Sequence, residues 1–331
     1  MSLVRAERRR LHKRRVTVVM LAIGVILLGL IAGGTWFSNH KVSDATRAAA
    51  VAQAEQEYQR ALDDWNSNGK KRCEDDVKAG QIPAEACQGP KPDYFLADYY
   101  MPSTFVFKAG FRDMLTVWAM IMAFVALVIG ASSIGAEWSS GSMMNLLTWQ
   151  PRRVRVLGTK LGVLLAVTAF WSLVVGALWT AAMWATAVFR GTTAGMTSGT
   201  WQSFALTGLR GLGVVAAAAV FGFVLASLGR RTAVAMGVLI ALIVVTQFGL
   251  TILLFMAKVR YPEMFFVGNH LQAWMNGSVT MYDQTSCDFS AGMCQPQQLV
   301  LTWQRAGTIF GAGLLALVGL SMWQIRARDV A

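Results

Sequence analysis

The sequence predicts an all-α integral membrane protein with six transmembrane helices and a small extracellular subdomain of helix and loop. Of its 331 residues, 55% are hydrophobic and only 15% are charged, whereas soluble domains are about 25% charged. Six long runs contain no Asp, Glu, Lys, Arg or His, and the net positive charge lies in only one set of the segments between them. These runs are residues 16–37, 114–134, 161–189, 211–228, 232–257 and 306–323.

Each run is long enough to cross a membrane as a helix, because a hydrocarbon core of about 30 Å needs about 20 apolar residues. A charge at the centre of a spanning helix costs about 2.5 to 3.5 kcal/mol, so its absence from all six runs favours membrane insertion. The first run follows a basic start, as the core of a cleaved secretory signal does. It continues past Gly33 and Gly34 into Trp36 and Phe37 without a small-x-small cleavage site. We therefore expect a retained helix.

The charges of the connecting segments predict the orientation. One set consists of residues 1–15, 135–160, 229–231 and 324–331. It carries 15 Lys and Arg against three acidic residues, a net charge of +12. The other set, residues 38–113, 190–210 and 258–305, carries 15 basic and 15 acidic residues. Since cytoplasmic loops carry the excess of Lys and Arg, we expect a multi-pass protein of the cell membrane with both termini in the cytoplasm.

The basic start of the chain is more typical of a membrane-surface segment than of a nucleic-acid-binding one. A polybasic stretch beside a membrane helix is attracted to anionic lipid headgroups by about 1 kcal/mol per residue. We therefore assign this 1–15 arm to the lipid surface and expect no nucleic-acid partner. Its membrane-surface residues are Arg8, Arg9, Arg10, Lys13, Arg14 and Arg15.

The four cysteines fall as two pairs, Cys73 with Cys87 and Cys287 with Cys294, both in segments expected outside the cell. Oxidising compartments permit disulfides, so we predict two local disulfides, with four free thiols as the alternative. Neither pair has a CxxC spacing or nearby histidines, so we expect no metal site.

Two outer segments are long enough to fold. In residues 38–113 an apolar stripe recurs every three or four positions and predicts an amphipathic helix. Residues 66–71 are expected to end that helix, and prolines keep the remainder irregular. Residues 258–305 mix short apolar stretches with Gly and Pro, which favours a re-entrant or lid-like segment of short helices.

No catalytic residues are evident. Ionisable groups inside membrane helices usually mark reaction pathways, and here there are none. No phosphate-binding loop with the Gly-x-x-x-x-Gly-Lys-Ser/Thr pattern occurs, and no serine nucleophile or zinc motif is present. The chain is therefore expected to bind no cofactor and not to be an enzyme.

The 135–160 segment is the longest connection on the basic side. Gly141 permits a turn before Ser142, a suitable helix N-cap, and Pro151 ends the short helix that follows. Met143, Leu146 and Leu147 then lie on one helical face, a spacing that helix-in-groove docking uses. An amphipathic helix lying on lipid is the alternative.

This segment is also where the chain resembles the ABC-2-type permease family of ATP-binding-cassette exporters. The resemblance rests on Glu137, Gly141, Leu146, Leu147 and Pro151, followed by an arginine cluster and Lys160, and on the six-span topology. Many members place a charged residue after the glutamate, where this chain has Trp138. The resemblance implies that the segment is a coupling helix that docks on a separate ATPase subunit. It assigns partner contacts to Glu137, Gly141, Met143, Leu146, Leu147, Pro151, Arg152, Arg153, Arg155 and Lys160.

From this resemblance we expect a permease subunit that forms the substrate path with a second permease chain, identical or related. ATP and magnesium would bind to the partner ATPase. The charge-free helices favour an amphipathic or apolar substrate such as a drug, lipid or peptide. The alternative is a membrane sensor or scaffold that binds a ligand outside the cell and transports nothing.

Overall fold

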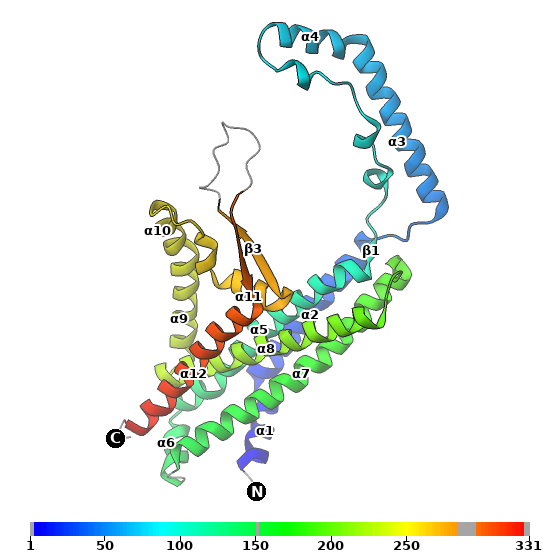
Figure 1. Ribbon diagram of the computed structural model, residues 1–331. Coiled ribbons are helices and arrows are strands. Elements are labelled where there is room, and N and C mark those ends of the chain that lie inside the picture. Colours follow the sequence, from blue (N-terminus) through cyan, green and yellow to red (C-terminus); the bar gives the residue numbers. More distant parts are fainter. Residues whose placement is uncertain (1–2, 150–151, 284–295, 328–331) are drawn as a thin grey trace. The chain divides into compact units, whose positions relative to one another are not determined.

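The computed structural model describes residues 3–149, 152–283 and 296–327 (Figure 1). Among these residues, six helices are long and apolar enough to cross a membrane, so the all-α, multi-pass fold class is confirmed. They are α2 (Arg15–Ser38), α5 (Phe107–Ser139), α7 (Arg153–Arg190), α8 (Ser198–Gly229), the stretch Thr232–Leu254, and α12 (Trp303–Ala327).

Five of the six helices extend beyond their charge-free runs at one or both ends, whereas the helix of the 232–257 run begins with the run and ends at Met256. Lys160 lies in α7 and Arg210 lies in α8, although both were counted in connecting segments. A helix can continue into the interface or into water, so its ends carry charges that its centre does not. The fifth span is also interrupted: α9 (Thr232–Val244) passes through a π-helical turn, η5 (Val245–Gly249), into α10 (Leu250–Met256).

The chain divides into two compact units, each described by itself. The first unit contains Met1–Ile31, Lys108–Ala182 and Gly195–Ala331. The second unit contains Ala32–Phe107 and Met183–Ala194.

Two helices of the first unit, α5 and α8, approach each other closely through glycines. A Cβ at Gly130 would overlap the carbonyl oxygen of Ala219, and one at Gly222 would overlap the carbonyl oxygen of Leu127. Small residues at such crossings let the helix backbones pack directly. Figure 1 shows these two helices side by side.

Three of the other spans are much less buried within the chain. Within the most apolar window of each helix, 17% of residues are buried in α2, 11% in α12 and 6% in the Thr232–Leu254 span, against 56% in α5. On α2 the buried positions are Thr17, Gly24 and Leu28, which form one narrow stripe. Large apolar faces of these helices are therefore left for lipid or for another protein.

The second unit contains the predicted amphipathic helix, α3 (Asp44–Asp64), whose N-terminus is capped by the Ser43 side chain. The expected helix end at residues 66–71 is wrong. The chain stays helical through a π-helical turn, η1 (Trp65–Gly69), into α4 (Lys70–Lys78). An extra residue in the turn absorbs the polar stretch without breaking the helix.

After α4 the second unit is mostly irregular. Three short 3₁₀ turns follow, η2 (Ala84–Ala86), η3 (Pro92–Tyr94) and η4 (Ala97–Tyr100). A disulfide joins Cys73 to Cys87, whereas Cys287 and Cys294 lie outside the described residues. Strand β1 (Phe105–Val106) pairs in parallel with β2 (Gly191–Thr192).

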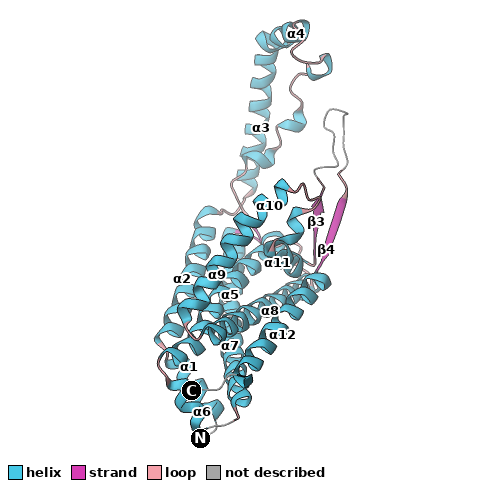
Figure 2. Ribbon diagram, turned by 90° about the vertical axis from the view of Figure 1, so that its left-hand side faces the viewer, coloured by secondary structure: helices cyan, strands magenta, loops and turns pink. Residues whose placement is uncertain are grey.

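In the segment between α10 and α12 the first unit adds an unexpected strand pair. A 3₁₀ turn, η6 (Pro262–Phe265), and α11 (Val267–Asn276) are the expected short helices. Strands β3 (Ser278–Tyr282) and β4 (Gln298–Thr302) follow in an antiparallel ladder (Figure 2). The buried side chains of Met281 and Leu301 join a small core with Ala273 and Ala306.

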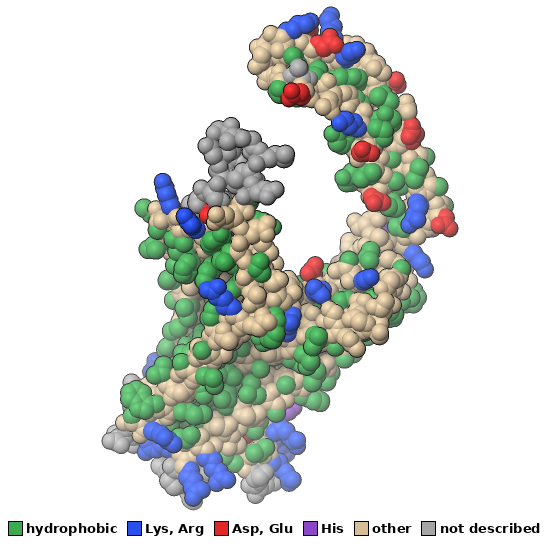
Figure 3. Space-filling model, viewed as in Figure 1, with side chains coloured by type: hydrophobic (Ala, Val, Ile, Leu, Met, Phe, Trp, Pro, Cys, Tyr) green, Lys and Arg blue, Asp and Glu red, His purple; other side chains and the backbone are tan. Residues whose placement is uncertain are grey.

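At one end of the first unit, α1 (Leu3–Lys13), α6 (Ser142–Trp149) and the C-terminal end of α12 lie together (Figures 1 and 2). Figure 3 shows Lys and Arg side chains gathered at this end.

Candidate functional site

The 135–160 segment forms a turn and a short helix between two spans. Helix α5 ends at Ser139, and Gly141 adopts a left-handed conformation with φ of 71°. The backbone thus reverses where glycine is favoured. Helix α6 then runs from Ser142 to Trp149, and α7 begins at Arg153, with the Arg152 carbonyl accepting N–H groups from its first turn.

Glu137, in the last turn of α5, is the centre of a buried ion network. Arg14 Nη2 donates a hydrogen bond of 2.6 Å to Glu137 Oε1, and Arg10 Nη1 lies 3.3 Å from the same oxygen. Lys160 Nζ, from α7, lies 2.7 Å from Glu137 Oε2. One carboxylate therefore meets three cations, one from α1, one from the junction between α1 and α2, and one from α7.

A second carboxylate comes from the 1–15 arm. Glu7 Oε1 accepts a hydrogen bond of 2.7 Å from Lys160 Nζ. Glu7 and Leu11 are the buried positions of α1. They are four positions apart and lie on one face of α1, and Arg14 follows in the junction before α2. The arm therefore binds the bundle through this face and through Arg14.

The network is shielded from water. The side chains of Glu137 and Lys160 are 3% and 4% exposed. Burial lowers the pKa of the Arg14 guanidinium below its ordinary value, and the neighbouring Glu137 carboxylate opposes this shift. Buried charges are tolerated only when they are paired, so removing one member leaves the others uncompensated. The network therefore fixes the arm, α5 and α7 relative to one another.

Several sequence assignments need correction. Arg14 points to Glu137, and its side chain is only 18% exposed, so it is not a lipid-surface residue; Arg10 shares this carboxylate but keeps a side chain that is 47% exposed. Lys160 is buried in the network and is not available to a partner. Met143 is 0% exposed, so it belongs to the core of the chain and not to a docking surface.

Other predicted residues remain accessible. Arg8, Arg9, Lys13 and Arg15 are exposed, as the lipid-surface assignment requires, and so are Arg152 and Arg155. Arg153 donates a hydrogen bond to the carbonyl of Ile325 near the end of α12. The side chains of Leu146 and Leu147, and the whole of Pro151, lie outside the described part of the chain.

Trp138, the residue after Glu137, has a partner of its own. The Arg230 guanidinium carbon lies 4.9 Å from the centre of the Trp138 ring, within the range of a cation–π interaction. Arg230 lies in the turn between α8 and α9. Sequence analysis missed this contact and the contact of Glu7 with Lys160, because nothing in the sequence pairs residues that are 92 or 153 positions apart. The helical spacing of Glu7 with Leu11 was the one available signal.

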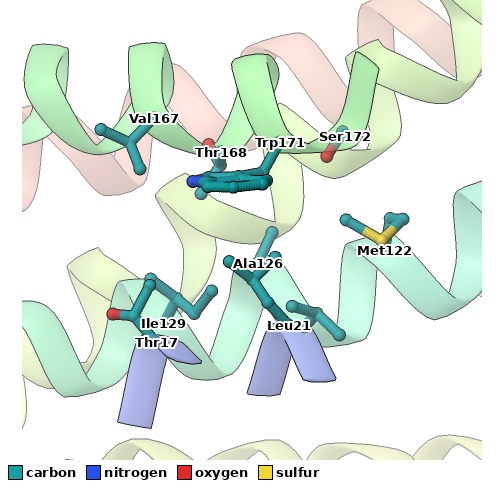
Figure 4. Close-up of a pocket in the computed structure, with 10 residues that line it drawn as sticks. Thr17, Leu21, Met122, Ala126, Ile129, Val167, Thr168, Trp171 and Ser172 are labelled. Carbon is teal, nitrogen blue, oxygen red and sulfur yellow. The ribbon is translucent and has the colours of Figure 1, made fainter. Parts of the chain in front are cut away.

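A small cavity lies farther along the bundle, between α2, α5 and α7 (Figure 4). It is lined by Thr17, Trp171 and Ser172, among other residues, and has room for about one water molecule. The hydroxyls of Thr17 and Ser172 are buried without a hydrogen-bond partner among the described residues. Drug-sized ligands need about 300 to 1,000 Å³, so this cavity does not hold a substrate of that size.

Within the described residues, no group of three His, Cys, Asp or Glu side chains is placed to hold a metal ion. The comparisons with known proteins give one family. The family described as "ABC-2 family transporter protein" matches residues 1–329. No curated protein and no solved structure matches the chain.

Proposed function

Because the chain belongs to the ABC-2 family of transporter proteins, we propose that it is the permease subunit of an ATP-driven exporter. It forms the substrate path across the membrane together with a second permease chain, identical or related. A separate ATPase subunit binds ATP and magnesium, and this chain is not itself an enzyme. Both termini and the 135–160 segment lie in the cytoplasm of a cell-membrane protein, as the +12 charge of that side suggests.

The observation that carries the proposal is the buried network around Glu137. A docking helix can drive a permease only if its displacement reaches the spans. Glu137 and Lys160 tie the two ends of the 135–160 segment to each other, and Glu7 and Arg14 tie them to the arm. Helix α6 lies between these ends, so movement of α6 acts on α5, α7 and α1 together.

Helix α6 docks in a groove of the ATPase through Leu146 and Leu147, and the exposed Arg152 and Arg155 bind acidic groups beside the groove. Met143 anchors the same helix in the permease. The substrate is amphipathic or apolar, because the spans carry no charge along their apolar runs. The largely uncovered faces of α2, α12 and the Thr232–Leu254 span offer surface for the second permease chain.

The test is the combined change Leu146→Ala and Leu147→Ala in the complex of permease and ATPase. Hydrolysis stimulated by the permease should fall by about tenfold or more, because anchor residues carry most of the binding energy of an interface. The matched control replaces Leu206 and Leu209 with alanine, two exposed residues of α8, and should leave hydrolysis unchanged. If no ATPase co-purifies with the wild-type chain, a sensor or scaffold becomes the better assignment.

A further inference from the structure

We propose that Trp138 and Arg230 form a transmission contact that links the 135–160 segment to α9. This inference rests on the proposed function, because it names the part of the bundle to which the 135–160 segment passes its movement beyond the residues around Glu137. The route runs from the last turn of α5, through the turn between α8 and α9, to the fifth span.

The contact is a stacked cation on an aromatic ring. The Arg230 guanidinium carbon lies 4.9 Å from the centre of the Trp138 ring. The Trp138 indole N–H is buried and has no hydrogen-bond partner among the described residues. The ring is therefore held by stacking and packing instead of by a hydrogen bond. A cation–π contact of this kind shifts an equilibrium by about two- to fivefold.

The strained backbone conformation of Arg230 indicates that its side chain has a specific role in the structure. Arg230 has φ of 54°, in the left-handed region, as the C-cap of α8. Glycine is the favoured residue there, because a side chain in this conformation is strained. Strain at a non-glycine residue persists where the surrounding structure uses that residue. The stacking of Arg230 on Trp138 explains why arginine occupies this position. Glycine would fit the turn without strain, but it has no side chain to stack on the ring.

A second contact joins the same two elements one turn away. A Cβ built on Gly135 would lie 2.6 Å from the backbone nitrogen of Thr232, the first residue of α9. Helix α5 therefore rests directly on the backbone at the start of α9. With Trp138 on Arg230, the end of α5 holds the α8–α9 turn at two points, so a shift of α5 moves the turn.

The fifth span is the one that can respond. Only 6% of its most apolar window is buried in the chain, against 50% for α8. Within this chain few contacts oppose its movement, and elements with few buried contacts move at low cost. Trp138 directly follows Glu137, so one helical turn connects both the arm and the fifth span to the 135–160 segment.

Hydrogen exchange on the complex of full-length permease and ATPase in lipid vesicles, with and without ATP, tests the proposal. In the wild type, ATP should change exchange at α6 and also at residues 229–231, by about two- to fivefold. Trp138→Ala should keep the change at α6 and lose it at residues 229–231. If ATP changes exchange at neither place, the proposed function fails. If it changes α6 alone in the wild type, only the present inference fails.

Three further variants separate transmission from a merely structural role. Trp138→Phe keeps an aromatic ring and removes the unpartnered N–H, and Arg230→Lys keeps a cation, so both should retain the response at residues 229–231. Arg230→Gly relieves the left-handed strain, so thermal unfolding should occur at the same or a higher temperature while the response is lost. An Arg230→Gly protein with a wild-type response at residues 229–231 would overturn the proposal.

Discussion

Lys160 on α7 reaches back to Glu137 on α5, with 2.7 Å between Nζ and Oε2, and closes the 135–160 segment at its base. The pair is buried. Lys160 also contacts Glu7, and Glu137 also contacts Arg14, both from the N-terminal arm. The segment is therefore part of a fixed frame made by α1, α5 and α7. Helix α6 lies between the two ends of the segment that this frame holds.

Glu137→Gln should destabilise the folded chain by about 3 to 5 kcal/mol, because Arg14, Arg10 and Lys160 lose the carboxylate that compensates them in a buried site. Denaturant unfolding in detergent micelles measures this. Glu57→Gln is the matched control. Glu57 pairs with Arg60 at an exposed position, where an ion pair contributes about 1 kcal/mol or less. Equal effects of the two changes would contradict the burial of the network.

Lys160 and Glu7 should behave as a coupled pair. Lys160→Met and Glu7→Gln each leave a buried charge with fewer partners, and the double variant removes both ends of the 2.7 Å contact. The loss of stability in the double variant should be smaller than the sum of the single losses by about 0.5 to 3 kcal/mol. Strict additivity in the same unfolding assay would show that the arm does not bind the bundle through this contact.

Met143→Ala should cost about 2 to 5 kcal/mol of folding stability, because the side chain is fully buried and its removal leaves a cavity. Met144→Ala, at the next and partly exposed position, is the control and should cost clearly less. A stable Met143→Ala protein that fails to bind the ATPase would instead return Met143 to the docking surface.

Gly222→Ala should disrupt the packing of α8 on α5, because the new Cβ would overlap the Leu127 carbonyl oxygen. Overpacking of this kind costs about 1 to 3 kcal/mol. Gly311→Ala places a Cβ in open space, and it should be neutral or slightly stabilising, since alanine favours helix over glycine. The comparison is made by thermal unfolding of the two purified variants.

The spans could be predicted from the sequence because the signal is local. A charge-free run long enough to cross the hydrocarbon is read from consecutive residues. Five of the six runs lie entirely within spanning helices, and the fifth, 232–257, ends one residue after α10 does. The turn at Gly141 and the short helix after it were also predictable, since a glycine turn and an N-cap are properties of neighbouring residues.

The remainder depends on contacts between distant residues. Charges are counted as solvent-facing when a sequence is divided into spans and loops, so Lys160 and Arg14 were assigned to surfaces. In the structure both side chains turn inward and pair with Glu137. Strands β3 and β4 were missed because each is only five residues long and is stabilised by the other. The Trp138–Arg230 contact was not predicted either, because the two residues lie far apart in the sequence.

The orientation of the chain can be tested with the cysteines. Cys73 and Cys87 are joined in a disulfide and should face the outside of the cell. A membrane-impermeant maleimide should label them in intact cells only after reduction. As the opposite-side control, a cysteine in place of exposed Arg155 should stay unlabelled until the membrane is opened. Labelling of that residue in intact cells would contradict the proposed topology.

Photo-crosslinking from Leu147 tests the central claim most directly. A photoreactive residue at position 147, in the complex purified from membranes, should form an adduct with the ATPase subunit. The same residue in place of exposed Tyr99 in the second unit should form none. An adduct from position 99 and not from position 147 would contradict the assignment of α6 as the element that docks on the ATPase.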